Sequence, residues 1–299
     1  MLFETLWIPV TLTAAAAQTA RNALQKNLTA TLGTAGATFV RFLYGLPFAL
    51  VLLAAVAVAL RAVPPLPGAR ALVWTACGGL TQVVATGLML VSMQRRSFAV
   101  TIATLKTEPV LVALFGFLAL GDRLSFGGAL GIVIATVGVV ITSLMPASDD
   151  ARRLDVASLA LGLASGALFA ISAVAFRGAI LSLAPASPLL AATTILAAAL
   201  TLQAVALAGW LALTARGVLI ATAREWRTSL LAGASGAFAS QFWFLGFALT
   251  TAANVRTLAL VEVLFAQVVS GRLLRETVRQ REAFGMALIV LGVAILLLH

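Results

Sequence analysis

The stretch AVTIATLKTEPVLVALFGFLALGDRLSFGGALGIVIATVGVVI, Ala99 to Ile141, has the same layout as Ala253 to Ile295, without a gap and at a shift of 154 residues. Each copy is a long apolar run with one acid near its middle, followed by a short charged turn and a second apolar run. The aligned pairs are Glu108 with Glu262, Asp122 with Glu276, Gly131 with Gly285 and Gly138 with Gly292. A repeat of this kind predicts a duplicated membrane unit.

The composition supports this interpretation. Of 299 residues, 62% are hydrophobic and only 10% are charged, whereas a water-soluble protein of this length needs many more charges on its surface. Apolar runs of about 18 or more residues recur along the whole chain and predict transmembrane helices. We therefore expect an all-α, polytopic membrane protein, and the N-terminal apolar run is interpreted as a retained helix rather than a cleaved signal.

Charge and residue usage exclude several functional classes. The net charge of +10 is explained by Lys and Arg between apolar runs, where they meet anionic head groups, so nucleic acid is not an expected partner. The single cysteine, Cys77, allows no intrachain disulfide, and the single histidine, His299, gives no basis for histidine catalysis. We expect no metal and no cofactor.

The apolar runs predict ten transmembrane helices. They lie near 5–25, 33–60, 70–92, 97–120, 126–145, 155–182, 187–213, 226–250, 253–272 and 280–298. The polar break after span five separates two units, 1–148 and 149–299, within one membrane domain. Because each unit has five helices, the two units are predicted to be inverted relative to each other around a central cavity.

Basic residues predict the orientation of the chain. The odd-numbered connections carry 13 Lys and Arg residues, Arg21 among them, and the even-numbered connections carry 5. This bias places the odd connections in the cytoplasm and both termini outside. The expected location is a bacterial-type inner (plasma) membrane.

The motif set resembles the drug/metabolite transporter superfamily, and its EamA-type branch in particular. The matching elements are Pro109 in the fourth helix, the pair Gly121-Asp122 before a short loop, and a fifth helix with Gly131 and Gly138. The second copy departs from this pattern, with Val263 at the proline position and Arg275 before Glu276. The resemblance implies a secondary transporter, in a family with members that export amino acids and related metabolites.

Two acids stand in apolar runs at equivalent positions. Ionised Glu108 and Glu262 would cost at least about 2.5 kcal/mol each at the bilayer centre, so each is expected to face a cavity or a partner. They could contact a substrate ammonium or carry a coupling proton. The alternative is a structural ion pair, with Arg41, Lys106 or Arg256 as the basic partner.

Basic and helix-breaking residues extend the candidate site. Arg41 could hold a substrate carboxylate, because a guanidinium offers a two-pronged match to it, while Lys106 is a second candidate. Either side chain could instead reach the head groups. Pro109 could act as a hinge or could form a harmless kink. Asp122 is expected to be a cap or a surface ion pair.

Polar and aromatic side chains in apolar runs complete the prediction. Amides at Gln82, Gln241 and Asn22 could line a substrate path or bond another helix. In helix eight, Phe242 and Trp243 could contact a bulky apolar substrate, with Phe238 on the same face as Phe242. The common alternative for these aromatic residues is packing or lipid contact.

Three functions remain open from the sequence. The leading prediction is a secondary-active transporter, acting as a monomer, that exports small metabolites such as amino acids by alternating access, with or without protons. An uncoupled facilitator or channel is the second. An intramembrane serine protease is the third, because Gly233-Ala-Ser235-Gly236 resembles a rhomboid serine motif, although that chemistry needs a histidine base.

Overall fold

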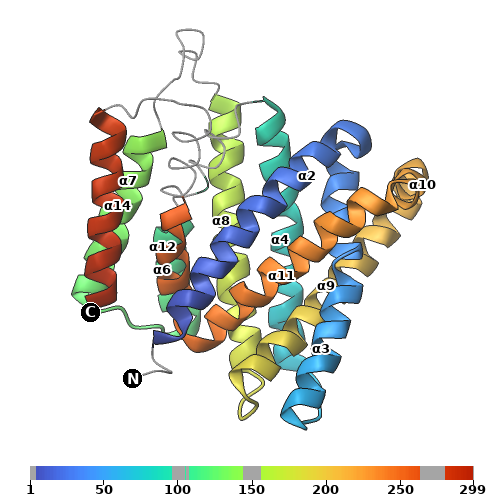
Figure 1. Ribbon diagram of the computed structural model, residues 1–299, viewed down its shortest axis with the longest axis horizontal. Helices are drawn as coiled ribbons and strands as arrows, with labels where there is room; N and C mark the ends of the chain where they lie inside the picture. The colour runs from blue at the N-terminus through green and yellow to red at the C-terminus, as the bar shows by residue number, and fades with distance from the viewer. Residues whose placement is uncertain (1–4, 96–104, 106–107, 144–155, 263–279, 299) are drawn as a thin grey trace.

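The computed structural model describes residues 5–95, 105, 108–143, 156–262 and 280–298, and within these residues the protein is helical with no strand (Figure 1). The all-α prediction is confirmed. The helices are α2 (Trp7–Leu43), α3 (Leu46–Leu60), α4 (Ala69–Arg95), α6 (Glu108–Leu120), α7 (Phe126–Ser143), α8 (Val156–Leu181), α9 (Pro188–Thr214), α10 (Arg216–Arg224), α11 (Trp226–Leu249), α12 (Ala252–Leu258), the 3-10 turn η2 (Ala259–Val261) and α14 (Gln280–Leu298).

Five described segments are long and apolar enough to cross a membrane. They are Asn27–Leu60, Ala69–Ser92, Ala160–Leu181, Pro188–Thr214 and Trp226–Leu249. Four shorter apolar helices accompany them: Glu108–Leu120, Phe126–Ile141, Ala252–Val261 and Ala283–Leu298. The protein is therefore a multi-pass membrane protein, and the figure of ten crossings stays a prediction.

The first two predicted spans differ from the observed helices. The helix α2 continues from Trp7 to Leu43, and its backbone breaks only at Gly33, where φ is 66° and ψ is 178°. Only glycine adopts that conformation at little cost, so Gly33 supplies the bend. A second break at Tyr44 and Gly45 precedes α3, whose first turn accommodates Pro47 because the missing N–H has no partner there anyway.

The short helix α10 was not expected from the sequence. It joins α9 to α11 and carries Arg216 and Arg224 at its two ends. In Figure 1 it lies far from the start of α2 and from the end of α14. A helix with basic ends and an apolar segment between them suits the head-group region of a bilayer.

The helices α7 and α14 pack through glycines along one edge of the molecule (Figure 1). A Cβ placed on Gly131 would lie 2.6 Å from the carbonyl oxygen of Gly292, and one on Gly138 would lie 2.6 Å from that of Gly285. The backbones therefore approach as closely as small residues in membrane helices allow. These contacts are reciprocal in the repeat register, because Gly131 aligns with Gly285 and Gly138 with Gly292.

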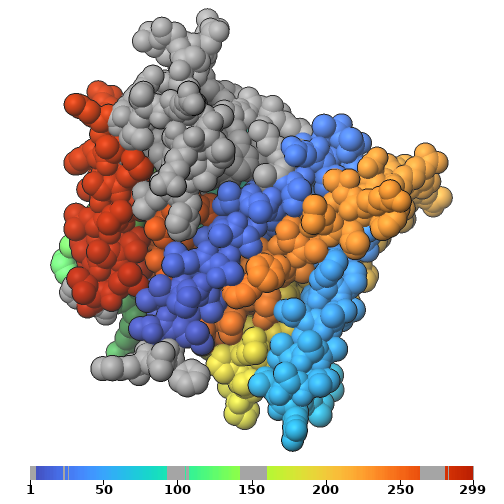
Figure 2. Space-filling model, viewed as in Figure 1, coloured from blue at the N-terminus to red at the C-terminus, as the bar shows by residue number. Residues whose placement is uncertain are grey.

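Two other helix pairs, α2 with α11 and α8 with α4, correspond to each other at the sequence shift of 154 residues. The helices α2 and α11 run side by side across one face of the molecule (Figure 2). At the shift of 154 residues, residues 7–27 of α2 align with 161–181 of α8, and 226–249 of α11 align with 72–95 of α4. The helices α4 and α8 also pack closely against each other. These central helices surround the site described next.

Candidate functional site

A narrow cavity of about 40 Å³ lies among α2, α4, α6, α8, α11 and α12. Its polar lining consists of Gln18, Arg21, Asn22, Arg41, Gln82, Glu108, Ser240, Arg256 and Glu262. Its apolar lining consists of Met89, Leu105, Phe169, Phe176, Trp243, Phe244 and Phe247. A cavity of this size holds only a few water molecules, so a metabolite would enter only if side chains or helices move apart.

Most of the predicted site residues meet at this cavity. The lining includes six of them: Glu108, Glu262, Arg41, Gln82, Asn22 and Trp243. They come from helices far apart in the sequence, and the two equivalent acids lie in the same cavity. Their contribution to binding or coupling stays a prediction.

Glu108 stands at the start of α6 and faces Arg256 of α12. The Arg256 Nε atom lies 3.1 Å from the Glu108 Oε1 atom, and both side chains are almost fully buried. The Arg256 guanidinium also lies over the Trp243 ring, 4.4 Å from its centroid. The ion pair is one of the structural partnerships anticipated for Glu108, and the face of the Trp243 ring attracts the Arg256 cation electrostatically.

Two further arginines from α2 reach the cavity. Arg21 is 3% exposed, and its Nη2 atom donates to the Asn22 Oδ1 atom at 2.9 Å. Arg41 is 4% exposed, and its Nη1 atom donates to the Thr86 hydroxyl at 2.9 Å. Gly236 of α11 leaves room for both, because a Cβ there would lie 3.5 Å from Arg21 Cδ and 3.7 Å from Arg41 Cγ.

Glu262 follows η2 directly and is 6% exposed. It interacts electrostatically with Arg21, which also experiences the charge of Arg256. Arg41 in turn experiences Arg21 and Arg256. The described lining thus holds three arginines and two glutamates, a buried charge set in which cations are in excess by one.

The predicted amides divide between the cavity and the helix contacts. Gln82 lines the cavity, and its Oε1 atom accepts from Gln203 Nε2 at 2.9 Å, which joins α4 to α9. Gln241 lies outside the lining, and its Nε2 atom donates to the Thr193 hydroxyl at 2.9 Å. Gln241 therefore bonds another helix, the alternative that we noted for it.

The aromatic residues of α11 also divide by face. Phe242 packs on Phe238 with ring centroids 4.8 Å apart; Phe238 is 51% exposed, whereas Phe242 is partly buried against the core and lies outside the cavity lining. Trp243, Phe244 and Phe247 instead line the cavity. The aromatic wall of the site thus lies on the next face of the helix from the one proposed around Phe242.

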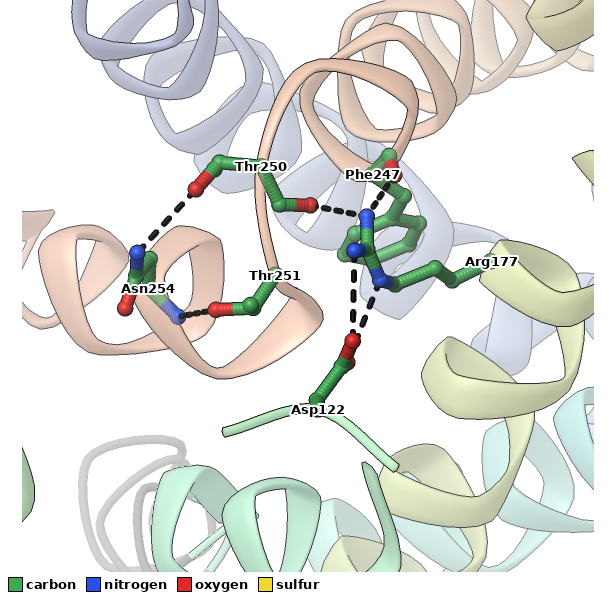
Figure 3. A network of polar contacts seen from close by, with 6 residues as sticks. All are labelled: Asp122, Arg177, Phe247, Thr250, Thr251 and Asn254. Carbon is green, nitrogen blue, oxygen red and sulfur yellow. Dashed lines mark hydrogen bonds and ion pairs between the residues drawn. The ribbon is translucent and has the colours of Figure 1, made fainter. Parts of the chain in front are cut away.

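A second polar network joins the α6–α7 connection, α8 and the end of α11 (Figure 3). Asp122, in the connection between α6 and α7, pairs with Arg177 of α8 through two contacts of 3.1 and 3.3 Å. Arg177 also donates to the carbonyl oxygens of Phe247 and Thr250. Gly121 allows the turn before Asp122, with φ of 69°. The network therefore ties three helix ends together, and Asp122 is an ion-pair residue, as expected.

Arg21 shows where the sequence interpretation was incomplete. The count of basic residues assigned Arg21 to the first connection, but the residue is buried within α2 and lines the cavity. Its spacing from Gln18, three residues, places both on one helix face and could have revealed this. Arg256 was counted with a connection in the same way, and the cavity-facing Phe176 and Ser240 carried no signal at all.

Other candidates are placed as follows. Lys106 and Glu276 lie outside the described residues. Pro109 lies in the first described turn of α6, and its role as a hinge stays a prediction. The Ser235 hydroxyl donates to the Ala232 carbonyl of its own helix, and Gly233 lies against the Tyr44 backbone. The serine motif is thus a close-packing patch.

Comparison with known families agrees with the helical membrane architecture and the motif set of the first half. The model of the EamA-like transporter family matches residues 5–144. Over these residues, the chain is similar to the EamA-like transporter family. The resemblance to the drug/metabolite transporter superfamily is thereby confirmed, and its members are membrane transporters rather than enzymes as a rule.

The fold is shared over nearly the whole chain with a solved protein. A solved structure described only as a crystal structure of a protein has a TM-score of 0.67 and covers 97% of this chain and 98% of its own, at 17% identity. This likeness concerns the fold alone. A comparison with curated proteins found no match. The EamA-like assignment thus makes the buried cavity a candidate substrate site.

Proposed function

We propose that this EamA-like protein is a secondary-active transporter that exports small metabolites, with amino acids as the substrate class, by alternating access. The observation that carries the proposal is the buried charged cavity, in which Glu108 and Glu262 stand at equivalent repeat positions. Buried ionisable groups in membrane helices mark substrate or ion pathways. The cavity contains both cationic and anionic groups, which suits a substrate that carries both a carboxylate and an ammonium group.

The moving parts in this proposal are the two inverted units, 1–148 and 149–299, of five helices each. The reciprocal contacts of Gly131 with Gly292 and of Gly138 with Gly285 support a two-fold relation between them. The corresponding pairs α2–α11 and α4–α8 support it as well. The narrow cavity would open to either side as one unit tilts against the other, in a bacterial-type inner membrane and within one protomer.

The test is counterflow and uptake of labelled amino acids in proteoliposomes, with and without a pH gradient. Saturable uptake that a gradient accelerates supports coupling to protons. Loss of that acceleration in Glu108→Gln, with uptake retained, assigns the coupling role to Glu108. Because removing one partner of a buried ion pair costs about 3–5 kcal/mol, the double variant Glu108→Gln/Arg256→Gln serves as the folding control.

One observation favours a second candidate function, an uncoupled facilitator. Glu108 already forms an ion pair with Arg256, so its carboxylate has a structural partner without any coupling role. In that case uptake would be saturable and indifferent to the pH gradient in both the wild type and Glu108→Gln. Absence of saturable uptake for every amino acid would refute the amino-acid assignment.

A further inference from the structure

The charges around the cavity are not balanced within the described residues. Glu108 is paired with Arg256, and Glu262 interacts with Arg21. The third cation, Arg41, has a neutral partner, the Thr86 hydroxyl, and forms no ion pair with any described residue. A guanidinium that stays charged in a buried site strongly favours an anion nearby.

Arg21 also has guanidinium N–H donors without a hydrogen-bond acceptor in the described structure. Of its guanidinium nitrogens, Nη2 donates to Asn22, whereas Nε and Nη1 have no hydrogen-bond partner in the described structure. The residue is 3% exposed, so bulk water does not satisfy these donors. A buried N–H without an acceptor is costly, and an acceptor oxygen at the cavity would remove that cost.

The two arginines converge although they are 20 residues apart. They belong to segments of α2 on either side of the break at Gly33, and both stems pass over Gly236 of α11. The planar guanidinium presents parallel N–H groups that match the two oxygens of a carboxylate. The cavity wall beside them is aromatic, formed by Phe176, Trp243 and Phe244.

We propose that Arg21 and Arg41 form a carboxylate subsite and that the transported metabolite is recognised by its carboxylate, with an apolar or aromatic body against the wall and no requirement for an amino group. This inference rests on the proposed transport function and defines its substrate class by the carboxylate. It extends the expected substrates from amino acids to deaminated carboxylic acids of the same shape.

The experiment uses three probes with one aromatic body: phenylalanine, 3-phenylpropanoate, which lacks the amino group, and phenethylamine, which lacks the carboxylate. Each is tested for stabilisation of the purified full-length protein against thermal unfolding and for counterflow in proteoliposomes. The variants are Arg41→Gln, Arg41→Lys and the control Arg216→Gln, which removes one exposed positive charge of α10.

We expect both carboxylates to bind the wild type and Arg216→Gln, and phenethylamine to bind neither. Arg41→Gln should weaken binding of the carboxylates at least about tenfold. Arg41→Lys should recover part of the lost affinity, because lysine keeps the positive charge but lacks the paired N–H groups of the guanidinium. A variant that fails to fold is recognised by its unfolding midpoint without ligand, and the probe comparison on the wild type then decides.

The outcomes separate the two proposals. If phenethylamine binds as well as phenylalanine, the carboxylate subsite is refuted while the transport function stands. If phenylalanine binds but 3-phenylpropanoate does not, the amino group is required and the broader substrate class is refuted. If no probe binds or exchanges, while labelled amino acids of other shapes do, the aromatic substrate class is refuted; if nothing exchanges, the proposed function itself fails.

Discussion

At the scale of single residues, the structure gives different roles to side chains of the same chemical type. Gln82 and Gln241 are both buried amides in apolar helices, yet only Gln82 lies at the cavity. The Gln241 amide instead donates a hydrogen bond to the Thr193 hydroxyl of α9. The direction of each side chain, rather than its chemical type, therefore separates candidates for substrate contact from residues that hold helices together.

This difference predicts the effect of removing Gln241. The substitution Gln241→Ala removes a hydrogen bond and leaves the Thr193 hydroxyl without its donor, so we expect a loss of about 1–2 kcal/mol in the free energy of unfolding. Substrate affinity should stay unchanged, because the residue does not face the cavity. Denaturant unfolding in detergent and substrate titration of the same preparation check both; a marked loss of affinity at normal stability would contradict this placement.

At the scale of helices, the close contact of α7 with α14 depends on glycines, which have no side chain to hold the backbones apart. The substitution Gly138→Ala would place a methyl group 2.6 Å from the Gly285 carbonyl oxygen, a backbone atom that cannot rotate away. Forcing the helices apart should cost about 1–3 kcal/mol in the free energy of unfolding.

The control for this prediction is Gly209→Ala in α9. A Cβ at Gly209 meets no atom within 4 Å, so this variant should be neutral or more stable by up to about 1 kcal/mol. Thermal unfolding of the two variants side by side measures the difference. Equal stability of Gly138→Ala and Gly209→Ala would show that the glycine contact is not required.

The Asp122–Arg177 pair gives a second prediction about helix ends. Arg177 connects the α6–α7 turn with the last residues of α11 (Figure 3). Asp122→Asn should lower the free energy of unfolding by about 1–3 kcal/mol, because it leaves a partly buried guanidinium without its carboxylate. A double-mutant cycle with Arg177→Gln should show coupling of at least about 0.5 kcal/mol. Strict additivity would mean that the ion pair contributes nothing.

At the scale of the whole molecule, α10 lies far from the start of α2 and from the end of α14 (Figure 1). The count of basic residues placed the odd connections in the cytoplasm. Arg21 and Arg256 line the cavity, so neither belongs to a connection between helices. Arg21 is removed from the odd-numbered connections and Arg256 from the even-numbered ones, which leaves the bias in the same direction. We therefore keep α10 on the cytoplasmic side and the α3–α4 connection outside.

Single cysteines in a Cys77→Ala background test this orientation. Leu66→Cys, in the connection between α3 and α4, is 93% exposed, and Gly217→Cys stands on exposed α10. A membrane-impermeant maleimide should label position 66 in intact cells and position 217 only after permeabilisation, because the bilayer excludes the charged reagent. The reverse pattern would invert the topology and place both termini in the cytoplasm.

Local patterns were enough to predict the helical membrane class, the buried acids and the EamA resemblance, because hydropathy, spacing and short motifs are properties of neighbouring residues. They did not reveal that α2 carries Arg21 into the cavity, did not single out Arg256 among the basic partners anticipated for Glu108, and did not place Phe242 outside the cavity lining. A membrane helix is apolar on the face toward lipid and on the face toward its neighbours, so its sequence carries little information about direction. Those partnerships arise only when helices distant in the chain pack together.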